Sequence, residues 1–195
     1  MDEGYIKYQC NWIISDEIKY QQIEEINAWR NIMRKHGLIG MYENGIGYGN
    51  ISIRIEKNIF LISGSATGGI EQLDETHYAL VTDYNISNNS LTCKGNTKAS
   101  SEALTHATIY ECSTETQAVI HVHQHNIWKK ILHDVPTTSA DISYGTPAMG
   151  FEVSQLFKET DVAEVKLIAM AGHEDGIISF GKTLEEAGNI LLKYL

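Results

Sequence analysis

The sequence predicts a fold of the α/β class, and three of its segments carry that prediction. Residues 15–35 repeat apolar side chains at the spacing of one helix face. Residues 49–62 alternate between apolar and polar side chains, which is typical of half-buried strands. Residues 118–123 form an apolar run interrupted by two histidines, which indicates a buried strand. Because no linker, repeat or low-complexity stretch divides the 195 residues, we expect a single domain over residues 1–195.

Caps, turns and periodicity place the individual elements. Ser15 is a candidate N-cap of the first helix, and either Ser100 or Ser101 of the second. Pro147 suits the first position of a third helix, and Thr183 opens a capping box. In chain order the sequence predicts a helix over residues 15–35, strands over 49–55, 59–62 and 78–82, a helix over 100–112, a strand over 118–123, a helix from 146, strands over 166–170 and 176–180, and a helix from 183 to the end.

Charge and cysteine content narrow the classes of partner and compartment. The net charge of −10 argues against nucleic acid or an anionic membrane as partner, because binding to either needs clustered lysine and arginine. The three cysteines are widely spaced and form no Cys-x-x-Cys motif, so neither a disulfide framework nor a thiolate metal site is indicated. With no apolar run long enough to span a bilayer and no basic segment leading into an apolar one, we expect a soluble, cytoplasmic protein.

The histidine pair of residues 118–123 is the first chemical signal. Side chains two residues apart on a strand share one face, which puts His121 and His123 about 7 Å apart. Two such imidazoles form half of a metal site, although a pair of core histidines bonded to backbone would show the same spacing. His173 ends a later predicted strand at a glycine-flanked turn and is a candidate third ligand. Three histidines with an open position are typical of a catalytic metal site.

Donor-rich segments indicate a second feature, an anion site. Ser100 and Ser101 stand at the mouth of a helix, where unpaired backbone N–H groups attract anions such as phosphate. An ordinary helix cap would explain the same residues. The pair Gly49-Asn50 and the loop of residues 63–69 also let backbone amides approach a ligand.

Five short motifs in order give the chain a resemblance to a known family. They are Gly49-Asn50-Ile51-Ser52, Leu61-Ile62-Ser63-Gly64-Ser65, Ser100-Ser101-Glu102 with His106 and Tyr110, His121-Val122-His123, and Gly172-His173. This set resembles the class II aldolase/adducin family from about residue 23 to residue 195. The resemblance implies a three-layer α/β/α fold with a central, mostly antiparallel sheet.

The resemblance also implies roles for individual residues. His121, His123 and His173 would bind one divalent metal ion per chain, zinc first, with manganese, cobalt or iron as alternatives. Glu102 would be the acid/base carboxylate. Because two alignments of the middle loop remain open, the phosphate-binding residues would be Gly49, Asn50, Ser65, Thr67, Gly68, Ser100 and Ser101.

The function implied is that of a class II aldolase-type lyase. Such an enzyme cleaves a phosphorylated ketose through a metal-stabilised enediolate, with a small sugar phosphate as partner and a homotetramer as the assembled form. Epimerisation and dehydration begin from the same chemistry, but the epimerases resembled here usually carry Asp at the place of Glu102. A catalytically silent binding module, as the head domain of adducin is understood to be, is a further alternative.

Some residues depart from the family pattern or stay outside it. The aldolases resembled have a longer segment with a tyrosine before the third helix, and whether Tyr144 replaces it stays open. Glu174 and Asp175 follow His173 where the family commonly has glycine, so either carboxylate is a candidate to reach the metal or the substrate. His106 is expected to support Glu102 rather than bind metal. His125 continues the strand face, whereas a cupin would need a glutamate shortly after the histidine pair.

Two further groups of residues complete the predictions. His36, His77 and His133 lie among polar residues and are expected at the surface. The apolar residues ahead of the first helix, which are Tyr5, Tyr8, Trp12 and Ile13, could pack on a neighbouring subunit or on their own domain.

Overall fold

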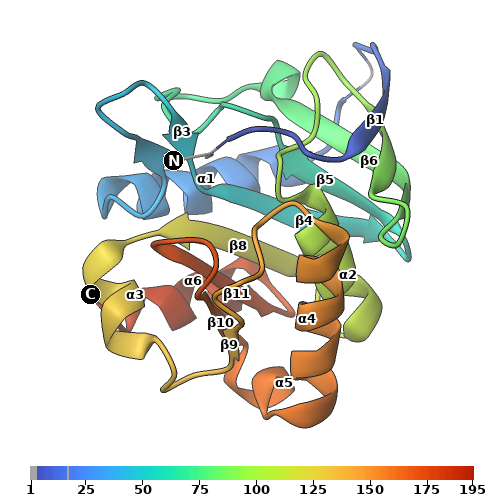
Figure 1. The fold of residues 1–195 in the computed structure, drawn as a ribbon. Coiled ribbons are helices and arrows are strands. Elements are labelled where there is room, and N and C mark those ends of the chain that lie inside the picture. The colour runs from blue at the N-terminus through green and yellow to red at the C-terminus, as the bar shows by residue number, and fades with distance from the viewer. Residues whose placement is uncertain (1–3, 17) are drawn as a thin grey trace.

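A nine-stranded sheet organises the molecule, and helices cover both of its faces (Figure 1). The computed structural model describes residues 4–16 and 18–195. The strand order is β1-β7-β6-β5-β4-β8-β11-β10-β9, and every neighbouring pair is antiparallel except the outermost pairs β1–β7 and β10–β9. The predicted three-layer α/β/α fold with a mostly antiparallel sheet is therefore confirmed.

The elements have the following bounds. The strands are β1 (Gln9–Ile13), β2 (Gly40–Met41), β3 (Gly47–Tyr48), β4 (Asn50–Glu56), β5 (Ile59–Ser63), β6 (Tyr78–Asn85), β7 (Ser90–Lys94), β8 (Ala118–His123), β9 (Thr137–Thr138), β10 (Leu167–Met170) and β11 (Gly176–Gly181). The helices are α1 (Gln22–Lys35), α2 (Ala103–Cys112), α3 (His125–Ile131), α4 (Pro147–Glu159), α5 (Val162–Val165) and α6 (Leu184–Leu192), with a 3-10 turn over Glu75–His77. Strands β2 and β3 form a small separate sheet.

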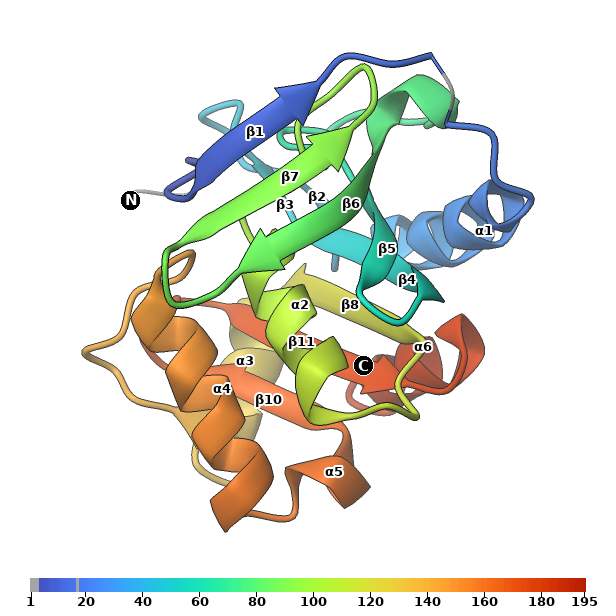
Figure 2. The ribbon, with the colours of Figure 1, turned by 90° about the vertical axis from the view of Figure 1, so that its right-hand side faces the viewer.

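Two apolar clusters hold the three layers together. Helices α1, α3 and α6 pack on one face of the sheet, with Ile26 and Leu191 against Ile120. Helices α2 and α4 pack on the other face, as Figure 2 shows in front of β8, β11 and β10, with Ala107 contributing to the cluster of Val119. Val119 and Ile120 enter opposite clusters because successive side chains of a strand point to opposite faces. This alternation fixes which face of β8 carries the histidines.

Most predicted elements form where the sequence placed them. The β4–β5 hairpin, β6, β8, β10 and β11 are all present. Helices α4 and α6 begin at the predicted caps, since Thr146 Oγ1 accepts from the Met149 N–H and Thr183 Oγ1 accepts from the Glu186 N–H. In a capping box the Glu186 side chain would accept from the N–H of the N-cap, Thr183. Here it accepts from the N–H of Lys182, one residue earlier.

The starts of the first two helices were predicted too early. Helix α1 begins at Gln22, and Ser15 lies two residues after the end of strand β1 and outside any helix. Residue 17 lies outside the described residues. Helix α2 begins at Ala103, with Glu102 rather than a serine at the N-cap, since Ser100 Oγ already accepts from the Glu102 N–H in the preceding turn.

Strands β1 and β7 and helix α3 are elements that the sequence reading missed. Strand β1 exposes Gln9 and Asn11 while it turns Cys10 and Trp12 inward, a pattern too short to recognise without its partner. That partner, β7, lies about eighty residues further along the chain. Across the described residues, no helix combines the length and the apolar character needed to cross a membrane.

Candidate active site

The three predicted histidines meet at one end of the central strands. Strand β8 is buried along its whole length and presents His121 and His123 on one face, while His173 comes from the turn between β10 and β11. The ring centroids are 4.8 Å apart for His121 and His123, 5.2 Å for His121 and His173, and 4.7 Å for His123 and His173. One ligand atom from each residue lies within 4.8 Å of the others, so the group could hold a single metal ion.

Neighbouring side chains orient two of these imidazoles. The Tyr42 hydroxyl lies 2.8 Å from Nδ1 of His123, and the Asn50 amide lies 3.1 Å from Nδ1 of His121. Nε2 of His121 is buried and has no hydrogen-bond partner among the described residues. A half-turn of the Asn50 amide would present Oδ1 to a protonated Nδ1, and that tautomer leaves the Nε2 lone pair for a metal. The site therefore fits a divalent ion.

Burial keeps the imidazole of His121 neutral, which is the state that a metal ligand requires. Desolvation, helped by the neighbouring His123 and His173, lowers the pKa of His121 well below its ordinary value. His106 lies behind the cluster, where Nδ1 is 2.7 Å from Ser52 Oγ, and burial lowers its pKa to about 3. His106 is outside the group that could bind a metal ion, as expected.

Glu102 is a buried carboxylate next to the histidines. Its Oε1 lies 3.7 Å from Nδ1 of His173, and its Oε2 accepts a 2.7 Å hydrogen bond from the Thr105 hydroxyl. Glu102 reaches this place because it is the N-cap of α2, at the point where the chain turns from the serine pair into the helix. The predicted acid/base residue is therefore within reach of a group held by His173.

A small polar pocket adjoins the histidine cluster. It gathers every residue that the sequence reading assigned to phosphate binding, which are Gly49, Asn50, Ser65, Thr67, Gly68, Ser100 and Ser101, together with Gly4, Gly47, Gly64 and Ala66. Asn50 belongs to both features, since its amide contacts His121. Both alignments of the middle loop lead here, because Ser65 and Thr67 line the same pocket.

Glycine lets the backbone close around this pocket. Gly49 has φ +77°, and a Cβ there would lie 2.7 Å from Ile39 Cγ1. A Cβ on Gly68 would lie 2.5 Å from the Gly40 carbonyl oxygen and 2.6 Å from that of Tyr48. No side chain fits at either place, so both positions require glycine.

Arg30 supports the pocket from helix α1, and the sequence reading missed it. Its guanidinium donates to the carbonyl oxygens of Thr67, Gly68 and Ile70, at 2.8, 3.2 and 2.6 Å. Burial, with Arg34 nearby, lowers the pKa of Arg30 to about 10, which leaves it charged at neutral pH. An arginine among the buried residues of an amphipathic helix indicates a buried polar contact. The sequence does not show which loop that arginine binds.

The other residues singled out from the sequence take several places. The Tyr144 ring stacks on His173 with centroids 4.5 Å apart and 23° between the planes. His125 is the first residue of α3 and not in a loop, and its Nδ1 lies 2.7 Å from Oδ1 of Asp175. With Glu174 these two form a second, more exposed group that could hold a cation. His36, His77 and His133 are not buried, and His77 joins Asp74 in a capping box.

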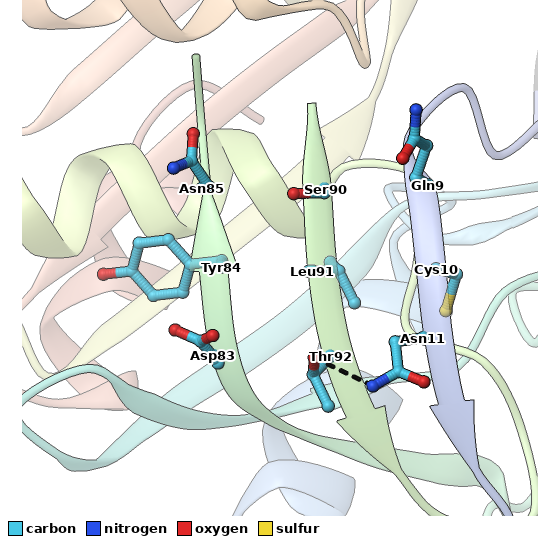
Figure 3. A pocket seen from close by; sticks show the side chains of 9 residues that line it. All are labelled: Gln9, Cys10, Asn11, Asp83, Tyr84, Asn85, Ser90, Leu91 and Thr92. Atoms are coloured by element: carbon cyan, nitrogen blue, oxygen red, sulfur yellow. Dashed lines mark hydrogen bonds between the residues drawn. The ribbon is translucent and has the colours of Figure 1, made fainter. Parts of the chain in front are cut away.

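A larger hollow lies on strands β6, β7 and β1, away from the histidines. It has a volume of about 450 Å³ and is lined mainly by polar side chains, among them Asn11, Asp83 and Asn85 (Figure 3). Asn11 donates to Thr92 Oγ1 across its floor at 3.3 Å. None of the predicted site residues contributes to it, so size alone does not identify the functional site.

Comparison with known proteins decides the family. The family model described as Class II Aldolase and Adducin N-terminal domain matches residues 24–193. The chain belongs to the class II aldolase/adducin family. A search of curated protein sequences gives no match to this chain.

Solved structures of class II aldolases share the fold. An L-fuculose 1-phosphate aldolase is 18% identical, with a TM-score of 0.66 over 92% of this chain and 84% of that one. A sugar-phosphate aldolase from Thermotoga maritima is 19% identical, with a TM-score of 0.61 over 89% of this chain and 94% of that one. An L-fuculose 1-phosphate aldolase from Glaciozyma antarctica is 16% identical, with a TM-score of 0.60 over 92% and 74%. At these identities the likeness concerns the fold.

Proposed function

We propose that this protein is a metal-dependent aldehyde-lyase that cleaves a phosphorylated ketose. One observation carries the proposal: three buried histidines lie next to a pocket of backbone amides and hydroxyls, and Asn50 belongs to both. Membership of the class II aldolase/adducin family supports the reaction class. The similar folds of L-fuculose 1-phosphate aldolase and a sugar-phosphate aldolase support the substrate class.

His121, His123 and His173 would hold the metal ion. Zinc suits three neutral imidazoles with an open position, and manganese, cobalt or iron would suit them as well. When bound, such an ion polarises the carbonyl and the adjacent hydroxyl oxygen of a ketose as a Lewis acid. Asn50 and Tyr42 keep two of the rings in place, which fixes where the substrate oxygens must sit.

Glu102 would move the proton. Retro-aldol cleavage breaks one carbon–carbon bond, frees the proton of the hydroxyl that becomes the aldehyde, and leaves an electron pair on the carbon beside the ketone. That carbon must then take up a proton. Glu102 Oε1, 3.7 Å from Nδ1 of His173, would lie beside the reacting carbons, while Thr105 holds the other carboxylate oxygen.

The polar pocket would bind the phosphate of the substrate. Its backbone N–H groups and the hydroxyls of Ser65 and Ser101 would be donors, while the Thr67 hydroxyl donates to the Gly64 carbonyl oxygen and holds the loop. The N-terminus of α2 adds a positive dipole end. Binding energy from the phosphate would then position the reacting carbons against the histidines and Glu102.

A screen of phosphorylated ketoses tests this function. Protein loaded with zinc or manganese should release an aldehyde and a three-carbon ketone fragment, detected by mass spectrometry of the products. An isomer of unchanged mass would indicate epimerisation, and a product lighter by one water would indicate dehydration. Protein that binds the sugar phosphate without any turnover would favour a silent adducin-like module and contradict the lyase.

Assembly and location complete the proposal. We propose a cytoplasmic homotetramer with the whole of residues 1–195 as one domain, because an active site at a subunit boundary excludes water better than one in an isolated chain. Light scattering at micromolar concentration should give a mass of about four chains. A fully active monomer would contradict the tetramer and leave the reaction class intact.

A further inference from the structure

The segment ahead of strand β1, here called the N-terminal arm (residues 4–8), lies against the candidate active site. Gly4 lines the polar pocket. The Tyr5 N–H donates to the Tyr144 hydroxyl at 3.3 Å, and the buried Tyr8 hydroxyl donates to the carbonyl oxygens of Ala99 and Ser100 at 2.7 and 3.2 Å. The arm is thus fastened both to the pocket and to the ring beside His173. It precedes residues 24–193, which are the part that the family model matches.

The ammonium group of Lys7, which belongs to the arm, lies over the ring of Tyr144. Its Nζ lies 3.8 Å above the centre of the Tyr144 ring, and that ring stacks 4.5 Å from His173. Gly145 has no side chain, and a Cβ there would lie 3.6 Å from Lys7 Cδ and 3.4 Å from the Ser101 carbonyl oxygen. The aliphatic part of the Lys7 side chain therefore runs beside Gly145, which lies between it and the Ser101 carbonyl oxygen.

The main chain of Lys7 is held as well. Asn89 Nδ2 donates to the Lys7 carbonyl oxygen at 3.0 Å, and the Gln9 N–H donates to the Asn89 carbonyl oxygen at 2.8 Å. These bonds begin the pairing of β1 with β7. An ammonium group with a fixed main chain and a ring beneath it is placed in advance of any ligand, so less freedom is lost on binding.

The polar pocket has no positively charged side chain of its own. Among the described residues that line it, none is a lysine or an arginine. A phosphate monoester carries close to two negative charges at neutral pH, and the chain as a whole has a net charge of −10. Backbone amides, hydroxyls and the N-terminus of α2 offer such a group only partial positive charges.

We propose that Lys7 binds an anionic group of the substrate, so that the N-terminal arm forms one wall of the substrate-binding site; this inference rests on the proposed function. The anionic group is the phosphate itself or a carboxylate on the adjoining carbon, and both offer the same oxygen acceptors to an ammonium group. Lys7 would thereby set the preference of this chain for substrates that are charged at this end.

Anion binding by the full-length, metal-loaded protein tests the role of Lys7 without requiring turnover. Isothermal titration calorimetry with inorganic phosphate and with phosphoglycolate should show affinity about tenfold lower for Lys7→Gln, since a charge-assisted hydrogen bond is lost. Lys7→Arg keeps the charge and the ring contact and should stay within about threefold. Lys98→Gln is the matched control, because Lys98 Nζ also lies over a ring, 5.7 Å from the centre of Trp12.

The pattern across the two probes identifies the group that Lys7 contacts. A loss for both probes indicates the phosphate, and a loss for phosphoglycolate alone indicates the carboxylate. Unchanged affinity of Lys7→Gln for both probes, or an equal loss in Lys98→Gln, would overturn the role of Lys7. If the wild-type protein binds neither probe, the anion pocket of the proposed function fails with it. Thermal unfolding without probe separates a structural role, which would lower the melting temperature and leave affinity unchanged.

Discussion

The two halves of the candidate site are built in different ways. The histidine cluster consists of side chains carried by strands and by one tight turn, all of them buried. The polar pocket consists mostly of backbone from several loops, closed by glycines such as Gly49 and Gly68. Asn50 belongs to both halves. It is the first residue of β4, it lines the pocket, and its amide contacts His121 on the neighbouring strand β8.

The two halves should differ in the substitutions that they tolerate. A metal ligand is defined by one atom of one side chain, so replacing His121 should remove one of the three proposed ligands outright. A backbone N–H survives most substitutions, provided that the chain keeps its path. We therefore expect large, all-or-none effects at the histidines and Glu102, and small, graded effects at the hydroxyls of the pocket.

The largest expected effect is loss of the metal. The double variant His121→Ala, His123→Ala removes two of three ligands, and the remaining imidazole should not retain an ion through gel filtration. Metal analysis of the purified protein should fall from about one divalent ion per chain to a small fraction of that. The matched control His36→Ala, His133→Ala removes two exposed histidines outside both groups that could hold a cation and should keep its metal. Wild-type protein that stays metal-free after incubation with zinc or manganese would contradict the metal site.

The second effect is loss of turnover with the metal retained. Glu102→Gln keeps the shape and the hydrogen bond from Thr105 but cannot carry a proton, so the rate should fall by about 10² or more. Metal content should stay at the wild-type level. Glu111→Gln, an exposed position on the same helix, is the control. If Glu102→Gln keeps wild-type turnover, the acid/base role moves to Glu174 or Asp175.

The same difference explains how much the sequence could predict. The sequence predicts His121, His123 and Glu102 as site residues because strand periodicity and the order of the motifs point to individual side chains. The seven predicted pocket residues also come together, since glycine-rich composition marks where backbone can approach a ligand. The strands and helices with long periodic patterns or clear caps were placed correctly for the same reason.

What the sequence did not reveal depends on contacts between distant segments. Arg30 and Tyr42 serve the site through partners 37 and 81 residues away, and no local pattern encodes those pairings. Strand β1 has a sequence too short to distinguish from a loop until β7 is beside it. Ser15 suits a helix cap by residue type, but the pairing of β1 with β7 runs as far as Ile13, only two residues before it.

A third, smaller effect concerns His106, which lies behind both halves. Burial lowers its pKa in the folded protein to about 3, against an ordinary value of 6.5, so the unfolded chain binds the proton more readily between these two pH values. Stability is therefore complete above pH 6.5 and falls as the pH drops through this window, by about 2 kcal/mol between pH 7 and pH 5. Denaturant unfolding of wild-type protein and His106→Gln at both pH values isolates the contribution. Equal pH dependence in the two proteins would mean that folding leaves the pKa of His106 unchanged and would contradict the shift.

The smallest expected effect tests the pocket through its two adjacent serines. Ser101 lines the pocket, and its hydroxyl makes no hydrogen bond within the part of the chain that the structure describes. Ser101→Ala should weaken binding of inorganic phosphate about fivefold, the equivalent of one neutral hydrogen bond, and should barely change the free energy of unfolding. Ser100 Oγ instead accepts from the Glu102 N–H at 3.4 Å, so Ser100→Ala should lower stability by about 1 kcal/mol. Calorimetry and denaturant unfolding of both variants separate an anion-binding hydroxyl from a capping one. Should Ser101→Ala bind phosphate like the wild type, the pocket would depend on backbone amides alone, and its contrast with the histidine cluster would be sharper still.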